Sequence, residues 1–206
     1  MTLRPFATRL MLALLSAVAV PLLGTPPAVA DEGMWTYDNF PSSVVKQRYG
    51  ADITPDGRYA MVANIGRGQG DNDTVSLVDL SMNPPRTVDT ITVGPTPEGI
   101  KIAPNGRYAA VVVHNGSANV PTSPFYNANG KVVLVGIAGG RLAKLSEEKI
   151  GRWSQGAAFS ADSATLLVQN MVEKDIMVFR IELDQLRDSM HRIKLSGGGA
   201  ALGTAR

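Results

Sequence analysis

The stretches Ile53-Thr-Pro-Asp-Gly-Arg-Tyr-Ala-Met-Val62 and Ile102-Ala-Pro-Asn-Gly-Arg-Tyr-Ala-Ala-Val111 are two copies of one pattern, and the second begins 49 residues after the first. A pattern that recurs at a period of this size is the sequence signature of a propeller or a solenoid, in which each unit needs its neighbours to bury its apolar face. The repeat therefore predicts an array of similar units.

Each copy holds a tight turn between two strands. Pro55 and Pro104 preset φ for the turn, and Gly57 and Gly106 accept positive φ. Apolar and polar residues then alternate with the period of a strand, which predicts strands at 58–64, 74–80 and 87–93, and again at 99–103, 107–113, 131–137 and 142–150. With a strand before the first turn there are four strands per unit, and residues 116–129 are an insertion in a loop.

A third copy is more divergent. Ala158-Phe-Ser-Ala-Asp-Ser-Ala-Thr-Leu-Leu-Val168 lacks the proline and the glycine, so we expect the turn to be lost, with further strands at 175–182 and 192–195. The joints at 94–99 and 151–156 match each other, and 197–204 looks like the start of a fourth unit. The prediction is an all-β fold, a partial β-propeller of about three four-stranded blades that is incomplete as a single chain. Helical signals are confined to 42–49 and, as one turn, to 184–190.

The first thirty residues have a composition of their own. Two arginines precede an apolar run that is too short to span a bilayer comfortably, and Ala28-Val29-Ala30 fits a signal-peptidase site. We therefore expect residues 1–30 to be a signal peptide and the mature protein to be periplasmic or secreted; an uncleaved anchor is the alternative. No later segment is apolar enough to cross a membrane, so no membrane contact is expected after cleavage.

Charge and cysteine content exclude several classes of function. The chain has 20 Lys plus Arg against 18 Asp plus Glu, and the expected signal peptide contains two of the arginines and no acid. A nearly neutral mature chain without a basic run offers no electrostatic footprint for nucleic acid. The absence of cysteine excludes disulfides, thiolate catalysis and cysteine-ligated metals.

The units resemble the YVTN-type β-propeller repeat across residues 51–205, and we assign 51–206 to the propeller blades. The matching features in the first unit are Thr54-Pro-Asp-Gly57, then Asn64, then the apolar strand Val75-Ser-Leu-Val-Asp79. The second unit matches less well, with Gly136 where the aspartate is expected and Asn115 displaced by His114. Members of this family share a fold and differ in role, from lactone hydrolysis and amine-dehydrogenase subunits to plain binding, so the resemblance implies a fold and no single activity.

Residues 31–50 resemble something else. Asp31-Glu-Gly-Met-Trp-Thr-Tyr-Asp-Asn-Phe-Pro-Ser-Ser-Val-Val-Lys-Gln-Arg-Tyr-Gly50 is similar to the mature N-terminus of periplasmic family-46 serine peptidases, the dipeptidyl-peptidase 7/11 type. Neither His114 nor His191 stands in that family's histidine motif, so no catalytic residue carries over. Two interpretations stay open: a truncated or fused reading frame joined near Gly50-Ala51, and a small natural propeller whose N-terminal segment packs beside the blades.

Four residues are candidates for ligand binding: Asn64, His114, Asn115 and Asn170. His114 ends a strand where propeller loops gather, and can be a ligand, a base or a polar cap. The three asparagines occupy similar places in the units and either line a binding face or cap turns. Trp153, Phe125 and Tyr126 either form a stacking surface or belong to the core.

We expect no metal and no other cofactor. Asp71-Asn-Asp73 lacks the spaced third carboxylate of a cation loop, and Gly66-Arg-Gly-Gln-Gly70 has no helix behind it to bind phosphate. The first functional hypothesis is an exported, non-catalytic binding module for a small molecule or protein on the loop face. The alternatives are a periplasmic serine dipeptidyl-peptidase, as residues 31–50 suggest, and a propeller enzyme such as a lactone hydrolase. A second copy could complete the ring.

Overall fold

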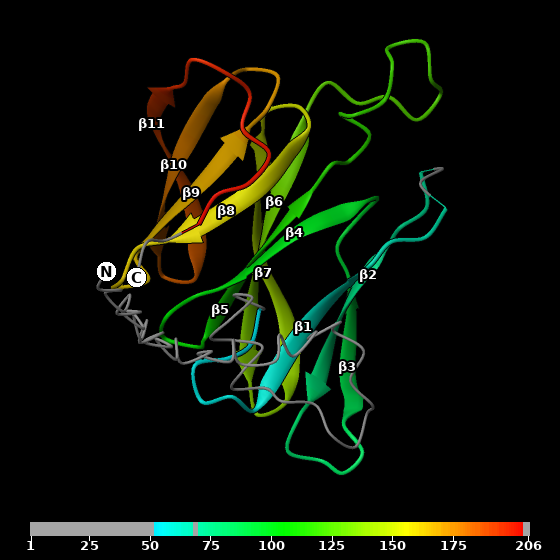
Figure 1. The fold of residues 1–206 in the computed structure, drawn as a ribbon, viewed down its shortest axis with the longest axis vertical. Helices are drawn as coiled ribbons and strands as arrows, with labels where there is room; N and C mark the ends of the chain where they lie inside the picture. Colours follow the sequence, from blue (N-terminus) through cyan, green and yellow to red (C-terminus); the bar gives the residue numbers. More distant parts are fainter. Residues whose placement is uncertain (1–51, 68–69, 204–206) are drawn as a thin grey trace, which may run out of the picture. The chain divides into compact units, whose positions relative to one another are not determined.

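The computed structural model describes residues 52–67 and 70–203. The expected signal peptide, the peptidase-like segment and the helical signal at 42–49 lie outside these residues. The described part contains strands and turns and no helix (Figure 1). The strands form three antiparallel sheets in chain order: β1 (Tyr59–Asn64), β2 (Thr74–Asp79) and β3 (Arg86–Thr92); β4 (Pro97–Ile102), β5 (Tyr108–Val113), β6 (Gly130–Ala138) and β7 (Arg141–Ile150); β8 (Ser154–Phe159), β9 (Thr165–Asn170), β10 (Asp175–Glu182) and β11 (Gln185–Lys194).

These three sheets are the blades that the repeat predicts, which confirms an all-β partial propeller of about three blades. The first blade differs from the prediction in one respect. Its expected innermost strand is reduced, in the described residues, to a single bridge between Ile53 and Ala60. The segment 184–190 also differs, because it opens the last strand, β11, and forms no helical turn.

The central blade explains how the sheets are held together. Strand β5 reads Tyr108-Ala-Ala-Val-Val-Val113, without the alternation of a half-buried strand, because both of its faces are buried. Val111 and Val113 pack against the first blade, whereas Ala110 and Val112 pack against the third. Full burial of a valine side chain contributes roughly 1.5–3 kcal/mol, so two apolar interfaces that share this blade join all three.

The third blade keeps the turn that its sequence was expected to lose. Gly57, Gly106 and Ser163 all have positive φ, at 75°, 70° and 62°. In each turn, the backbone N–H of this residue donates to the carbonyl three residues earlier, at 2.8 to 2.9 Å. The expectation was wrong because a serine can adopt the left-handed conformation when neighbouring hydrogen bonds hold the chain in the turn.

Those hydrogen bonds come from a hydroxyl and a carboxylate. Ser160 Oγ donates to Asp162 Oδ1 at 2.5 Å and accepts from the backbone N–H of Thr165 at 2.9 Å. Thr54 and Asp56 make the same two contacts in the first blade, at 2.6 and 2.9 Å. The turn therefore depends on this side-chain pair as well as on proline and glycine.

The C-terminal segment lies where a fourth blade would begin. A β-carbon added to Gly99 would strike the backbone carbonyl of Gln155, because β8 passes closely over β4. A β-carbon added to Gly156 would strike the backbone of Ala201 and Leu202 in the same way, and Figure 1 shows this red segment beside β8. The spacing of Gly198 and Gly203 repeats that of the two earlier joints, as the sequence suggested.

Candidate functional site

The sheets have two chemically different ends. Strands β1, β5 and β9 each begin at one of the three turns, and we call this the turn end (54–57, 103–106 and 160–163). They finish at the opposite edge, the loop end, where the joints 94–99 and 151–156 lead into β4 and β8. All four candidate residues from the sequence lie at the loop end.

Strand register shows which candidates are equivalent. Asn64 pairs with Thr74 and Asn170 with Asp175, whereas the corresponding pair in the central blade is Val113 with Lys131. Val113 therefore takes the place of an asparagine, and Asn115 lies two residues beyond it. The extra residue His114 is what displaces Asn115 from the pattern.

Asn170 is fully used in contacts within its own blade. Its side chain is 1 % exposed. Its Oδ1 accepts from the backbone N–H of Gly151 at 2.9 Å and from Ser154 Oγ at 2.7 Å, and its Nδ2 donates to Asp175 Oδ1 at 2.8 Å. These are the contacts of a structural cap that ties the joint to β9 and β10.

Asn64 makes contacts of the same kind at an exposed position. Its Nδ2 donates to Thr74 Oγ1 at 3.0 Å and to Ser76 Oγ at 2.8 Å, both on the neighbouring strand β2. These contacts are the ones expected if Asn64 and Asn170 cap turns. Ligand binding by either residue stays a prediction.

His114 lies in a different environment from the asparagines. Its side chain is 4 % exposed, and its backbone N–H donates to the carbonyl of Thr96 at 2.9 Å. Its Nε2 has no hydrogen-bond partner among the described residues and lies 3.6 Å from Oε2 of Glu98. A buried nitrogen without a partner is uncommon in folded proteins, and such a group often marks a ligand or water position.

Glu98 and Gln155 complete this cluster. Glu98 is 34 % exposed, and its Oε2 accepts from Gln155 Nε2 at 2.9 Å. The two residues occupy the same place in the matching joints. Glu98 is the second residue of β4, and Gln155 is the second residue of β8. We call Glu98, His114 and Gln155 the loop-end cluster.

Burial and a neighbouring charge act in opposite directions on His114. Burial lowers the pKa of His114, against the opposing effects of Glu98 and of a hydrogen bond to the backbone of Ser154.

Trp153 precedes Ser154 in the joint and is not part of the core. It has φ of 51°, and Thr96 has φ of 60° at the same position of the earlier joint. Left-handed backbone is unfavourable for such side chains, so the fold holds both residues in a strained conformation. The backbone N–H of Trp153 donates to Ser117 Oγ at 3.1 Å, and its side chain is 43 % exposed.

A second polar feature of the loop end is a cavity of about 510 Å³ beside β6 and β7. Its lining combines three carboxamides with charged side chains: Asn115, Asn127, Asn129, Lys131, Glu147, Glu148 and Lys149. Lys131 and Glu147 form an ion pair at 3.1 Å. The candidate Asn115 thus lines a cavity, but it is not in the loop-end cluster.

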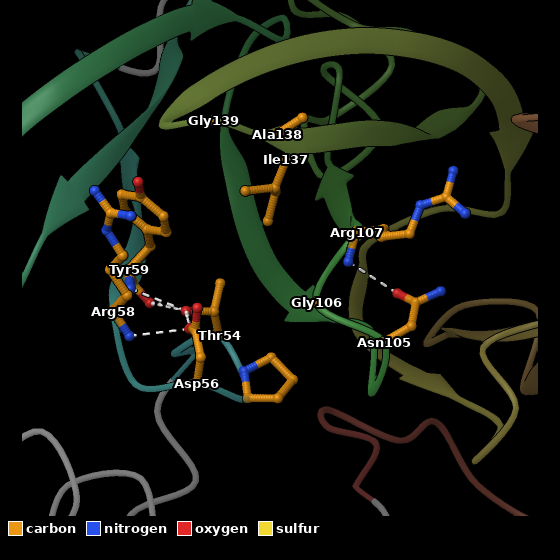
Figure 2. A pocket seen from close by; sticks show the side chains of 11 residues that line it. Thr54, Asp56, Arg58, Tyr59, Asn105, Gly106, Arg107, Ile137, Ala138 and Gly139 are labelled. Carbon is orange, nitrogen blue, oxygen red and sulfur yellow. Dashed lines mark hydrogen bonds between the residues drawn. The ribbon is translucent and has the colours of Figure 1, made fainter.

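The turn end also has a cavity, of about 360 Å³, between the first two turns (Figure 2). Figure 2 shows Thr54 and Asp56 hydrogen-bonded within their own turn, and Asn105 accepting from the backbone of Arg107. The Arg58 guanidinium is paired with Asp79 at 3.3 Å. The polar groups here are used to build the turns, so this cavity is the weaker candidate.

Asp73, from the possible cation loop, has a structural role. Its Oδ1 accepts from the backbone N–H of Gly66 and its Oδ2 from that of Thr96, each at 2.8 Å. No group of three or more His, Asp or Glu side chains within 52–67 and 70–203 is placed to hold a metal ion. Nor does this part of the chain contain a helix long and apolar enough to span a bilayer.

Sequence reasoning missed Glu98 and Gln155. Glu98 precedes His114 by a whole strand, so no local motif joins the two residues. The signal that could have found the pair was the match between the joints 94–99 and 151–156, which places position 98 of one blade beside position 155 of the next.

Comparison with known proteins supports the architecture. No protein-family model matches this sequence, and no curated protein matches it either. Among solved structures, the chain is similar to a candidate 6-phosphogluconolactonase from Bacteroides uniformis (17 % identity, TM-score 0.55, 71 % of this chain and 40 % of that one). It is also similar to hydrazine synthase of Kuenenia stuttgartiensis (16 %, TM-score 0.53, 73 % and 51 %) and to the periplasmic gluconolactonase of Pseudomonas aeruginosa (16 %, TM-score 0.50, 64 % and 38 %).

At this level of identity the likeness shows the fold alone. The matches span 38 % to 51 % of those proteins, so the chain corresponds to about half of each or less. The protein is therefore a β-propeller by fold, with about three blades in its described residues.

Proposed function

We propose that this protein is an exported, non-catalytic binding module of the YVTN-type β-propeller class, and that its ligand contacts the loop end. The observation that carries the proposal is the loop-end cluster, in which a buried histidine nitrogen without a hydrogen bond faces a half-exposed carboxylate. The ligand is a small molecule or a segment of a protein. Export rests on the signal peptide expected at residues 1–30.

The hydroxyl groups nearest to His114 are used in structural contacts. Ser154 Oγ bonds to Asn170, and Ser117 Oγ accepts from the backbone of Trp153. A serine-peptidase mechanism needs a hydroxyl within hydrogen-bonding reach of the histidine ring, with a carboxylate on the ring's other side. In the loop-end cluster the free ring nitrogen faces a carboxylate instead, which supports binding rather than acyl transfer.

Two assays test this proposal. Ligand-observed NMR screening should find small polar molecules that bind the full chain, and the signal should weaken in Glu98→Gln but persist in Asn105→Ala at the turn end. Fluorogenic dipeptide substrates should show no turnover. Hydrolysis that disappears in His114→Ala would refute the non-catalytic function, and binding that disappears only in Asn105→Ala would place the ligand at the wrong end.

Lactone hydrolysis is a second candidate function, because a histidine beside a carboxylate can accept a proton from water. The His114 and Glu98 pair is the observation that favours it. If it holds, the full chain should open gluconolactone faster than buffer does, and Glu98→Gln should reduce the rate at least tenfold. Equal rates in both proteins would exclude it.

The dipeptidyl-peptidase alternative rests on residues 31–50, which lie outside the described residues. It stays a prediction, and the fluorogenic dipeptide assay decides it. Any activity that requires this segment should be lost when residues 31–50 are deleted, while the fold of the three blades should be retained.

Association with a second copy is also part of the proposal. The outer face of the first blade bears Val62 and that of the third bears Ile193, both exposed, whereas both faces of the central blade are covered. Pairing of such faces between two copies would cover them and form a six-bladed ring. Native mass spectrometry should then report a dimer, and a monodisperse monomer would contradict this association.

A further inference from the structure

The three blades place different pairs of side chains at one equivalent position of the loop end, where β2, β6 and β10 begin and face the last strand of their blade. In the third blade Asp175 lies opposite Lys194, and the two form an ion pair at 2.9 Å. Two threonines occupy this position in the first blade. In the central blade it holds Lys131 opposite Lys149. Like charges directly opposite each other destabilise a sheet, so the central blade has an unfavourable pair where the third has a favourable one.

One carboxylate on this face of the central blade serves two lysines. Oε2 of Glu147 lies 3.1 Å from Nζ of Lys131 and 2.6 Å from Nζ of Lys144. Lys149 forms no ion pair with a carboxylate of the described residues. Glu148 belongs to the opposite face of β7, because successive side chains of a strand alternate. Three ammonium groups therefore share one carboxylate on this face.

The lysine pair borders a cavity large enough for a ligand. Both Lys131 and Lys149 line the loop-end cavity of about 510 Å³. This volume falls within the range of small-molecule sites, roughly 300–1,000 Å³. Side chains that are directly opposite have β-carbons about 4.5–5.5 Å apart. Two flexible lysine side chains at this spacing can both contact one group between them.

The carboxamides of the cavity add a further donor. Asn115 Nδ2 donates to the carbonyl of Asn129 at 3.3 Å, and Asn127 Oδ1 accepts from the backbone N–H of Asn129 at 3.2 Å. These contacts fix the end of the insertion beside β6. They leave Asn127 Nδ2 without an acceptor among the described residues. This amide can therefore donate to a group bound in the cavity.

Charge selects the kind of group that fits between the lysines. A cation would add to their repulsion, and a neutral hydroxyl would leave that repulsion in place. An oxyanion accepts hydrogen bonds from ammonium and amide groups together, and such charge-assisted bonds are stronger than neutral ones.

We propose that Lys131 and Lys149 bind an oxyanion in this cavity, the carboxylate or phosphate group of a small molecule, with Asn127 as a further donor. The bound anion supplies to the central blade the opposite charge that Asp175 gives to Lys194 in the third. This site is separate from the loop-end cluster, and the inference goes beyond the function proposed above.

The test is a pair of titrations of the full chain at neutral pH, one with sodium succinate and one with sodium phosphate, followed by NMR of the amides of Asn115, Asn127 and Asn129. Sodium chloride at equal ionic strength is the blank, and succinamide is the uncharged match of succinate. At least one oxyanion should shift these signals in a saturable way, and the tighter of the two identifies the group. An equal response to chloride would mean an adventitious ion only, and an equal response to succinamide would also overturn the proposal.

A charge reversal assigns the effect to the lysine pair. Lys149→Glu gives the central blade an opposite-charge pair like that of the third blade. It should weaken oxyanion binding at least about tenfold, because one charge-assisted donor is replaced by a repelling carboxylate. It should also raise the midpoint of thermal unfolding, since attraction replaces repulsion across the strands. A raised midpoint with unchanged binding would overturn the proposal.

A second pair of like charges provides the matched control. Arg180 lies opposite Arg187 in the third blade, and neither residue lines the loop-end cavity. Arg187→Glu makes the same change of net charge as Lys149→Glu and relieves a similar repulsion. It should change oxyanion binding less than about twofold, because exposed charges at a distance are screened by salt. An equal loss in the two variants would assign the binding to net charge and contradict the site.

The outcome of these titrations is distinguishable from that of the ligand screen. If the screen finds ligands that depend on Glu98 while neither oxyanion shifts the three asparagines, this inference alone is wrong. If an oxyanion binds as expected and the screen finds no ligand, the binding function of the loop-end cluster is wrong and this site stands. If both experiments are negative, both proposals are wrong.

Discussion

The turn end and the loop end of the sheets differ in how their polar side chains are used. At the turn end, the side chains of the first and third turns bond within their own turns and fix the backbone. At the loop end, His114 Nε2 has no partner and faces Glu98. One strand, β5, connects these ends. The difference indicates that the turn end builds the repeat and that the loop end is available for a ligand.

The largest loss of stability is expected at Asn170. This residue lies at the loop end, but its polar side chain is used in structural hydrogen bonds, as those of the turn end are. Asn170→Ala should lower the free energy of unfolding by about 3 kcal/mol, because it removes the hydrogen bonds that this buried side chain makes with Gly151, Ser154 and Asp175. Urea denaturation measures it. The matched control is Asn64→Ala at the equivalent, exposed position, which should cost under about 1 kcal/mol. Equal losses would contradict the structural role given to Asn170.

The next largest loss of stability tests whether the hydroxyl of Ser160 or Thr54 stabilises its turn. Ser160→Ala and Thr54→Ala should each cost about 1 kcal/mol, the usual contribution of such a hydrogen bond. The second turn has Ala103 at this position, so the fold tolerates the change. Thr122→Ala, in the exposed insertion, is the control. No loss in Ser160→Ala would mean that the backbone alone keeps Ser163 at positive φ.

The Ser160–Asp162 pair also predicts how the stability of the fold depends on pH. The hydrogen bond from Ser160 holds the pKa of Asp162 below its usual value. Stability from this carboxylate is therefore present above its unfolded pKa and is lost as the pH falls through the folded one. In Ser160→Ala, carboxyl NMR should show the pKa of Asp162 rising toward its ordinary value. An unchanged pKa would assign the shift to other groups.

The smallest change in stability is expected at the loop-end cluster. Glu98→Gln should alter the free energy of unfolding by under about 0.5 kcal/mol, because Glu98 is half-exposed and, within the residues that the structure describes, pairs with no lysine or arginine. It should also lower the pKa of His114 further, since the Glu98 charge raises that pKa against burial. NMR of the ring measures this. A rise in the pKa of His114 would contradict the electrostatic account.

The depressed pKa of His114 has a consequence of known sign. The unfolded chain takes up a proton near pH 6.5, whereas the buried ring does so at lower pH. Stability from His114 should therefore fall as the pH decreases below about 6.5, and this fall should be greater in Glu98→Gln.

Most of the fold was predictable from the sequence. The paired Pro-x-Gly turns and strand alternation predicted the strands of the first two blades, since local chemistry determines both. The turn at Ser163 was not predictable, because its positive φ depends on Ser160 and Asp162 rather than on its own residue type. The last strand was longer than expected for a related reason: β10 pairs with residues 185–194, which have little apolar alternation.

The candidate site was predictable only in part. His114 was identified from its position at the end of a strand, but Glu98 lies one strand earlier in the same blade and Gln155 comes from the adjacent blade, and such contacts leave little signal in the local sequence. For Trp153 the sequence left a stacking surface and the core open, and the structure leaves its side chain 43 % exposed. Contacts between residues far apart in the chain were the part that sequence reasoning missed.

The most direct test of the contrast between the two ends is a map of backbone amide shifts across residues 52–67 and 70–203 during titration with a small polar ligand found in the NMR screen. The account predicts that the changes cluster at Glu98, His114 and Gln155 and are absent around Asn105 and Gly139 at the turn end. Changes centred on the turn-end cavity, with the loop end unmoved, would contradict it.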